Sequence, residues 1–204
     1  MGVVYRWVYA VDASVRFFIR DFNSLRLLIV NAAVPVMVLA TYELLMGVLD
    51  TYIDSMIAVM APYSRAMVGN FLHFIGSMMY LVTAALIIAF TVTSVFMVNG
   101  LISGLRNDLR AVINIFRSSM GIITYIVLIM VLTSAYSFAL GVSISAALVL
   151  VIMKVLTTLG IVPISNYGIN MVGALPELLP LLLIITLTYV VEGVVWVRRY
   201  ASLP

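Results

Sequence analysis

Residues 121–160 form an apolar run in which Lys154 is the only charged side chain. As a helix, this run extends about 60 Å, which is roughly twice the hydrocarbon thickness of a lipid bilayer. Two interpretations follow: one long helix that continues outside the membrane, or a hairpin that turns near Gly141 and Ser143. Both place this part of the chain in a membrane, because it has almost no charged side chains with which to cover a surface in water.

The composition of the whole chain also indicates a lipid environment. Hydrophobic residues make up 65% of the 204 residues and charged residues 9%, whereas a soluble domain carries about 25% charged residues. We therefore predict an all-α, polytopic membrane protein with a single transmembrane domain over residues 1–204. The lack of cysteine excludes disulfides and thiolate ligands, and the single histidine excludes a multi-histidine metal site, so no metal or cofactor is expected. The few, scattered basic residues do not indicate a nucleic-acid surface.

Four segments are long and apolar enough to cross the bilayer, counting one span in the run described above. We assign the spans to residues 27–49, 71–99, 121–153 and 178–197. Residues 3–26 precede them, and their apolar side chains recur every three or four positions, which predicts an amphipathic helix at the membrane surface. These side chains are Val4, Val8, Val11, Val15, Phe18, Phe22 and Leu25. Residues 50–70 are expected to form a short polar connection.

The basic residues predict the orientation of the spans. If four spans start from the cytoplasm, nine of the eleven basic residues lie on the cytoplasmic side, as the positive-inside rule requires. These nine are Arg6, Arg16, Arg20, Arg26, Arg106, Arg110, Arg117, Arg198 and Arg199. A hairpin within residues 121–160 would move the last two to the outside, so one long span is favoured. We therefore expect a multi-pass protein of the cell membrane with both termini in the cytoplasm.

The chain carries no motif of a soluble enzyme. It lacks the G-x-x-x-x-G-K-[ST] phosphate-binding loop, the G-x-S-x-G nucleophile turn and the H-E-x-x-H zinc motif. We therefore expect no catalytic residue and no enzymatic activity in this chain. Any energy for mechanical work or transport must come from a partner protein or from an ion gradient.

Polar side chains inside the predicted spans are the remaining candidates for a site. Glu43 is the one acidic residue well inside a span, and with Asn31 it forms a candidate intramembrane polar site. Glu43 either relays protons or binds a cation, or it is a neutral or hydrogen-bonded side chain packed against another helix, or it snorkels to the outer interface. Asn31 with Pro35 marks either a hinge or a kink that is satisfied by packing. Glu192, near the end of the last span, is expected to pair with the two arginines at 198–199.

Two stretches of the chain resemble the permease subunits of the FtsX/MacB type, the mechanotransmission class of ABC transporters. The first is LISGLRNDLRAVINIFRSSMGII, whose charged cluster and following turn are similar to the cytoplasmic segment after that family's second span. The second is the closing VWVRRYASLP. The order of the predicted parts is also similar, but this chain lacks the family's large extracytoplasmic domain and has only residues 50–70 in its place.

The resemblance implies a permease subunit that is driven by a separate ATP-binding cassette ATPase. It also implies pairing with a second permease subunit and contact with membrane lipid. Residues 104–119 would then be a cytoplasmic coupling helix, and Arg106, Asp108, Arg110 and Arg117 would dock the ATPase. Alternatively, these arginines only obey the positive-inside rule and meet anionic headgroups. The alternative functions are a non-transporting scaffold of a larger machine, such as a secretion or pilus apparatus, and an ion-coupled carrier that uses Glu43.

Overall fold

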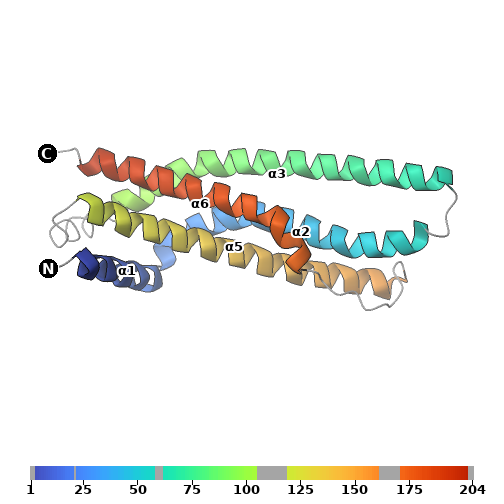
Figure 1. The fold of residues 1–204 in the computed structure, drawn as a ribbon, viewed down its shortest axis with the longest axis horizontal. Coiled ribbons are helices and arrows are strands. Elements are labelled where there is room, and N and C mark those ends of the chain that lie inside the picture. The colour runs from blue at the N-terminus through green and yellow to red at the C-terminus, as the bar shows by residue number, and fades with distance from the viewer. Residues whose placement is uncertain (1–2, 21, 58–61, 105–118, 161–170, 202–204) are drawn as a thin grey trace. The chain divides into compact units, whose positions relative to one another are not determined.

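The computed structural model of the chain describes residues 3–20, 22–57, 62–104, 119–160 and 171–201. All of these residues are helical except a turn at residues 159–160. The helices are α1 (Val3–Arg20), α2 (Phe22–Ile57), α3 (Pro62–Gly104), α5 (Ser119–Thr158) and α6 (Met171–Ala201) (Figure 1). The prediction of an all-α chain is confirmed for the described residues.

In the part of the chain that the structure describes, four helices are long and apolar enough to span a membrane, as predicted. The apolar stretches are Phe22–Val48 in α2, Ala66–Ser103 in α3, Gly121–Thr158 in α5 and Gly173–Arg199 in α6. A bilayer core needs about 20 residues of helix, and the stretches in α3 and α5 each contain 38. This composition and length indicate a multi-pass membrane protein.

The helices extend beyond the predicted spans at several ends. The expected polar connection over residues 50–70 is mostly helical, since α2 continues to Ile57 and α3 already begins at Pro62. Scattered charged residues do not end a helix, because their side chains can extend into solvent while the backbone stays hydrogen-bonded. Proline at the first helical position lacks only an amide hydrogen that has no partner there, so Pro62 marks the start of α3.

Helix α5 is continuous through the segment where the hairpin alternative predicts a turn. It has no turn near Gly141, and Ser143 and Ser145 donate to the carbonyl oxygens of Ala139 and Gly141, each at 2.7–2.8 Å. A hydroxyl that bonds to its own helix in this way is satisfied without water. The helix ends instead at Thr158, followed within two residues by Gly160, whose φ of 70° is the left-handed conformation that commonly terminates helices. The hairpin alternative is therefore wrong.

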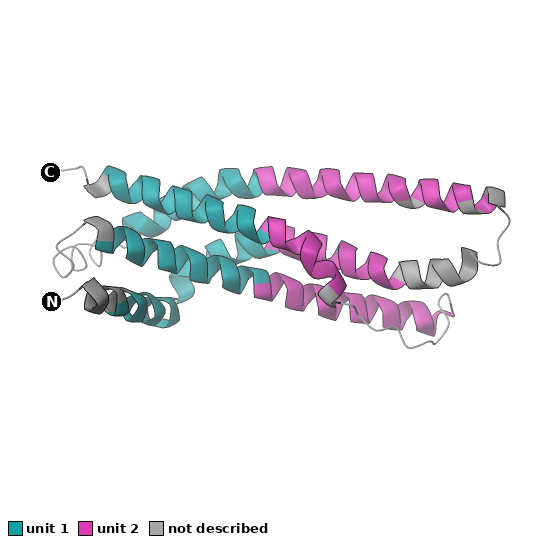
Figure 2. Cartoon of the chain, viewed as in Figure 1, with its two compact units in different colours: residues 1–33, 89–138, 182–204 teal, residues 34–88, 139–181 magenta. Residues whose placement is uncertain are grey.

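The chain folds into two compact units, and each takes a segment from all four spanning helices (Figure 2). Unit 1 consists of residues 1–33, 89–138 and 182–204, and unit 2 of residues 34–88 and 139–181. In α2 and in α6, the boundary between the units lies within two residues of a proline, Pro35 and Pro180 respectively. Each proline leaves one carbonyl of its helix without the usual amide donor. Two of the helices thus lose a backbone hydrogen bond close to where they pass from one unit to the other.

Charged residues are distributed unequally between the sequence ranges of the two units. The ranges of unit 1 contain nine of the eleven basic residues and four acidic ones. The ranges of unit 2 contain Arg65, Lys154 and the other four acidic residues, Glu43, Asp50, Asp54 and Glu177. The nine basic residues of unit 1 are the same nine that the sequence assigned to one side of the membrane. Unit 1 is therefore the basic part of the chain and unit 2 the slightly acidic part.

In unit 1, helix α1 packs against α5 mainly through a different face from the predicted apolar stripe. Ser14 is fully buried and donates to the carbonyl oxygen of Tyr125 at 3.3 Å, and the Phe17 ring lies edge-on to the Tyr125 ring at 6.2 Å. The stripe residues Val8, Val11 and Val15 are exposed. The helix predicted over residues 3–26 is thus a helix only to Arg20, and Phe22 and Leu25 of its stripe belong to α2. Within α1, Phe18 contacts Tyr136 of α5, while the three exposed valines make no packed core with the rest of the chain.

In unit 2, helix α2 contacts both α5 and α3. The Ser145 hydroxyl lies 2.8 Å from the carbonyl oxygen of Met37 as well as from that of Gly141, so its one proton bonds either to α2 or to its own helix. On the α3 side, the rings of Tyr42 and Tyr80 lie edge-on with their centroids 6.3 Å apart. The Tyr42 hydroxyl occupies the space where a Cβ on Gly76 would stand. The lack of a side chain at Gly76 is therefore what lets α2 approach α3 here.

Candidate functional site

The predicted ATPase-docking residues cannot be placed. Arg106, Asp108, Arg110 and Arg117 all fall in residues 105–118, which lie outside the described residues. The helix predicted over residues 104–119 falls there as well, apart from its two end residues, which are the last of α3 and the first of α5. These assignments stay predictions.

Asn31 and Glu43, the two predicted intramembrane polar residues, belong to different units. Both lie on α2 and both are half-buried, but Asn31 is in unit 1 and Glu43 in unit 2. Each is therefore considered with the neighbours in its own unit. Unit 1 is the one in which polar side chains from several helices are brought together around a predicted residue.

The Asn31 amide links α2 to α3. Its Oδ1 accepts a hydrogen bond from the Thr93 hydroxyl at 2.8 Å, and its Nδ2 donates a longer one to the Phe90 carbonyl oxygen at 3.5 Å. Both polar atoms of the amide are thus used across the same pair of helices. In a bilayer, such interhelical hydrogen bonds hold helices together because lipid offers no competing partner.

The Thr93 hydroxyl has a choice of acceptors. Besides Asn31, the carbonyl oxygens of Ala89 and Phe90 lie 2.9 and 3.1 Å from its Oγ1. A hydroxyl has one proton to donate, so it bonds either to Asn31 or to its own helix. The contact between α2 and α3 can therefore open without leaving this hydroxyl unsatisfied.

Tyr189 of α6 closes the cluster from a third helix. Its side chain is fully buried, and its hydroxyl donates to the Leu28 carbonyl oxygen at 2.6 Å. Its ring lies 5.2 Å from the ring of Phe90, inclined by 56°. Leu28 precedes Asn31 by one helical turn, so α3 and α6 contact neighbouring turns of α2. We call Leu28, Asn31, Phe90, Thr93 and Tyr189 the polar cluster.

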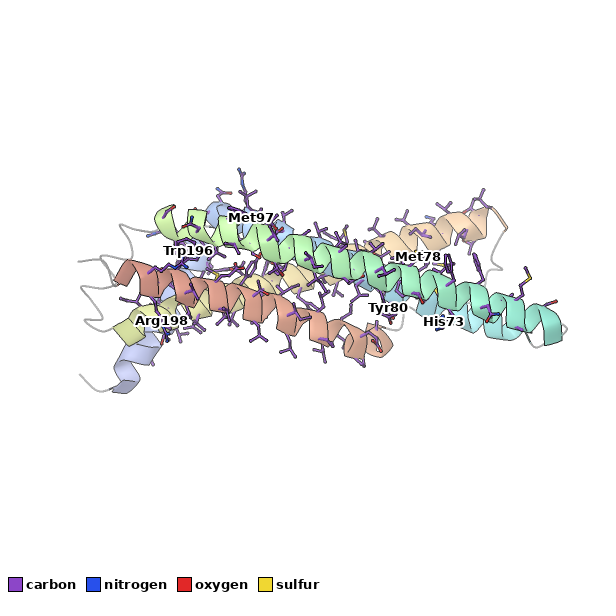
Figure 3. All side chains as sticks on the ribbon, turned by 90° about the horizontal axis from the view of Figure 1, so that it is seen from above. His73, Met78, Tyr80, Met97, Trp196 and Arg198 are labelled. Atoms are coloured by element: carbon purple, nitrogen blue, oxygen red, sulfur yellow. The ribbon has the colours of Figure 1, made fainter. Side chains whose placement is uncertain are left out.

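Glu192 follows Tyr189 by one turn of α6, and its environment differs from the one predicted. Its Oε2 is buried and has no hydrogen-bond partner, and Glu192 forms no ion pair within the described residues. The expected pairing with the arginines at 198–199 is therefore wrong. Side chains meet along a helix at separations of three or four residues, and these arginines lie six and seven positions away. Arg199 instead has its guanidinium 5.0 Å from the centre of the Trp196 ring; Figure 3 labels Trp196 and Arg198 on the last turns of α6.

Close packing between α5 and α6 fixes this part of α6 in unit 1. The Thr186 hydroxyl donates to the Ser134 hydroxyl at 2.9 Å. Two turns further along α6, a Cβ built on Gly193 would stand 3.0 Å from Cγ2 of Ile126. Such a small residue at a helix contact allows close approach in membrane proteins. Glu192 is therefore held beside the polar cluster by a tightly packed helix.

Sequence reasoning found Asn31 but missed its partners. Thr93 and Tyr189 belong to no short motif, and a threonine or tyrosine in an apolar segment is common at helix contacts. For Tyr189, the sequence offers one signal: its spacing of three residues from Glu192 puts a phenolic and an acidic group on one face of the last span. No group of three or more histidine, cysteine, aspartate or glutamate residues suited to a metal ion occurs in the part of the chain that the structure describes.

Comparisons with known proteins add no relative. No family model, no curated protein and no solved structure matches the chain. The resemblance to FtsX/MacB-type permeases therefore depends only on the residues quoted above.

We expect a measurable coupling between Asn31 and Thr93. In a double-mutant cycle of Asn31→Ala and Thr93→Val, the coupling free energy should be about 0.6 kcal/mol and at most about 1.7 kcal/mol, as for other interhelical hydrogen bonds in membranes. Reversible unfolding in mixed micelles measures it. Thr188→Val provides the control, because the Thr188 hydroxyl donates to Ile184 of its own helix. Equal coupling of Asn31 with Thr93 and with Thr188 would contradict the contact.

Proposed function

We propose that this chain is the membrane-spanning subunit of an FtsX/MacB-like ABC-type permease or mechanotransmission complex, located in the cell membrane and driven by a separate ATPase. The observation that carries the proposal is the charge of unit 1. Its residue ranges include both ends of the chain, the α3–α5 connection and nine of the eleven basic residues. A cytoplasmic ATPase needs such a segment, linked directly to spanning helices, through which to move them.

The proposed orientation places both termini and the α3–α5 connection in the cytoplasm. The natural chain contains no cysteine, so single cysteines can be introduced without background. In sealed cells, an impermeant thiol reagent should label cysteines at Ser55 and Ser165 and should leave those at Ser118 and Ser202 unlabelled until the membrane is opened. The reverse pattern, or labelling of Ser118 and Ser202 on opposite sides, would contradict the orientation.

Docking of the ATPase is tested on the α3–α5 connection. Reversal of Arg106 and Arg110 to glutamate should reduce the amount of co-purified ATPase at least about tenfold. Two charges of the same sign that face each other across an interface cost several kcal/mol. Gentle-detergent purification with mass spectrometry measures this amount. Reversal of Arg198 and Arg199 is the matched control, because it changes the same charge in the same unit outside the proposed docking segment.

Two outcomes of this purification would replace the proposal. If no nucleotide-binding protein is recovered with the unmodified chain, the permease assignment fails. If many other membrane proteins are recovered without an ATPase, the scaffold function takes its place. Reconstitution with zwitterionic and with anionic lipid separates docking from headgroup binding, because only headgroup binding requires anionic lipid.

The remaining proposed partners are lipid and a second permease subunit. Much of α3 is exposed along its length, and the exposed side chains are large and apolar, as for Phe71, Phe74, Leu81, Ile88 and Phe96. A surface of this kind requires lipid or another membrane helix to cover it. We propose that a second permease subunit covers part of it and that lipid covers the rest, including the exposed stripe of α1. The mass of the complex in native mass spectrometry tests the dimer.

A further inference from the structure

Glu192 is the acidic side chain of unit 1 whose surroundings the proposed function does not explain. It lies within the Gly173–Arg199 apolar stretch, it is half-buried, and its buried Oε2 has no hydrogen-bond partner. Burying an ionised carboxylate without a donor or a counter-ion costs several kcal/mol even after the protein relaxes. Inside a membrane, such a group is expected to have a functional role.

The nearest polar groups do not stabilise a charge on Glu192. The Tyr189 hydroxyl, one turn away, gives its proton to the Leu28 carbonyl oxygen, and the Asn31 amide is used by Thr93 and Phe90. The α5 residues against the adjacent Gly193 are Ile126 and Met130, which are apolar. Tyr189 is a titratable group one helical turn from Glu192, and no described lysine or arginine forms an ion pair with Glu192.

The occupant that fits this oxygen is a proton. A metal cation takes several oxygen ligands at once, and no group of three or more histidine, cysteine, aspartate or glutamate residues that could hold one occurs among the described residues. A proton needs only the carboxyl oxygen itself, and it converts a buried charge into a neutral group. We propose that Glu192 is a proton-binding site within the membrane part of unit 1, with the carboxyl group protonated in the conformation described here.

This site is independent of the ATPase. It adds a protonation step to a subunit that the proposed function treats as driven by ATP alone, and it uses an α6 residue rather than Glu43 on α2. Because Glu192 is half-buried, it is not sealed from its surroundings and can exchange its proton. The proposal therefore stands or falls separately from the co-purification experiments.

Labelling with dicyclohexylcarbodiimide tests the proposal on the complete chain in native membranes. This apolar reagent takes the proton of a neutral carboxyl group on one of its nitrogens, while the carboxyl oxygen attacks its central carbon; the adduct then rearranges to a stable N-acylurea. At pH 7, Glu192 should be labelled at least about tenfold more than Glu177, because the reagent requires a neutral carboxyl group. A tenfold ratio of labelling corresponds to about 1.4 kcal/mol in the free energy of protonation. Glu177 lies on the same helix and is exposed. Mass spectrometry of the peptides identifies the labelled residue.

The pH and salt dependence of this labelling shows whether a proton or a metal cation binds to the Glu192 carboxyl group. Labelling of Glu192 should fall as the pH is raised and should be unaffected by sodium or magnesium ions at constant pH. A second readout is the infrared band of the protonated carboxyl group, which should be lost in the Glu192→Gln variant. Equal labelling of Glu192 and Glu177, protection by a metal ion, or an unchanged infrared band in Glu192→Gln would overturn the proposal.

Discussion

Replacing Tyr189 with alanine should lower the free energy of unfolding by about 3–5 kcal/mol, as for other fully buried aromatic residues. The side chain is completely buried, its ring contacts Phe90, and its hydroxyl bonds to the backbone of α2. The substitution therefore removes packing from three helices and leaves a cavity in the centre of unit 1. Equilibrium unfolding in mixed micelles, monitored by tryptophan fluorescence, measures the change.

The Tyr189→Phe variant separates the hydrogen bond from the packing. The Leu28 carbonyl oxygen still has the amide of its own helix as a donor, so loss of the hydroxyl should cost only about 0.5–1.5 kcal/mol. Phe96→Ala is the matched control for removing an aromatic ring, because Phe96 is in the same unit and is 73% exposed. If Tyr189→Ala destabilises the protein no more than Phe96→Ala does, the polar cluster does not hold the three helices together.

The sequence predicted the spanning helices better than the polar cluster, because the cluster depends on contacts between residues far apart in the chain. An apolar run such as residues 121–160 specifies a spanning helix by composition alone, because only a helix satisfies its backbone within lipid. The same argument cannot locate helix ends outside the membrane, which is why α2 and α3 extend into the predicted connection. The hydrogen bonds of the cluster join residues about 60 positions apart, at Asn31, and about 160 positions apart, between Tyr189 and Leu28, and no local pattern identifies such partners.

The charged residues show both the strength and the limit of local reasoning. The nine basic residues that the sequence assigns to the cytoplasm all fall in the ranges of unit 1, while the side of the membrane on which they lie stays a prediction. The pairing of Glu192 with the terminal arginines failed, because proximity in sequence was taken for proximity on the helix surface. A helix turns by 100° and rises about 1.5 Å per residue, so Arg198 points to a different side of α6 from Glu192, while Arg199 lies on the same side but about two turns further along the axis.

A leucine at Gly193 tests the close contact between α5 and α6. A Cβ at this position would lie 3.0 Å from Cγ2 of Ile126 and 3.4 Å from Cγ of Met130. Since the contact with Ile126 is already tight and Met130 is in van der Waals contact, the rest of a leucine side chain has no space without moving α5 away from α6. Overpacking of this kind costs about 1–3 kcal/mol. The Gly193→Ala variant should have a smaller effect, because it adds only the Cβ, for which the Ile126 side chain has to shift by a few tenths of an ångström.

The matched control for this substitution is Gly100→Leu in α3. Gly100 is exposed and in the same unit, and a Cβ there would have no heavy atom within 4 Å in the described part of the chain. Both variants gain up to about 1 kcal/mol from the higher helix propensity of leucine. The difference between their free energies of unfolding therefore isolates the steric term, and Gly193→Leu should be the less stable of the two by about 1–3 kcal/mol. Equal stability would mean that α6 does not need a glycine to approach α5, and that Glu192 is not held in place by this contact.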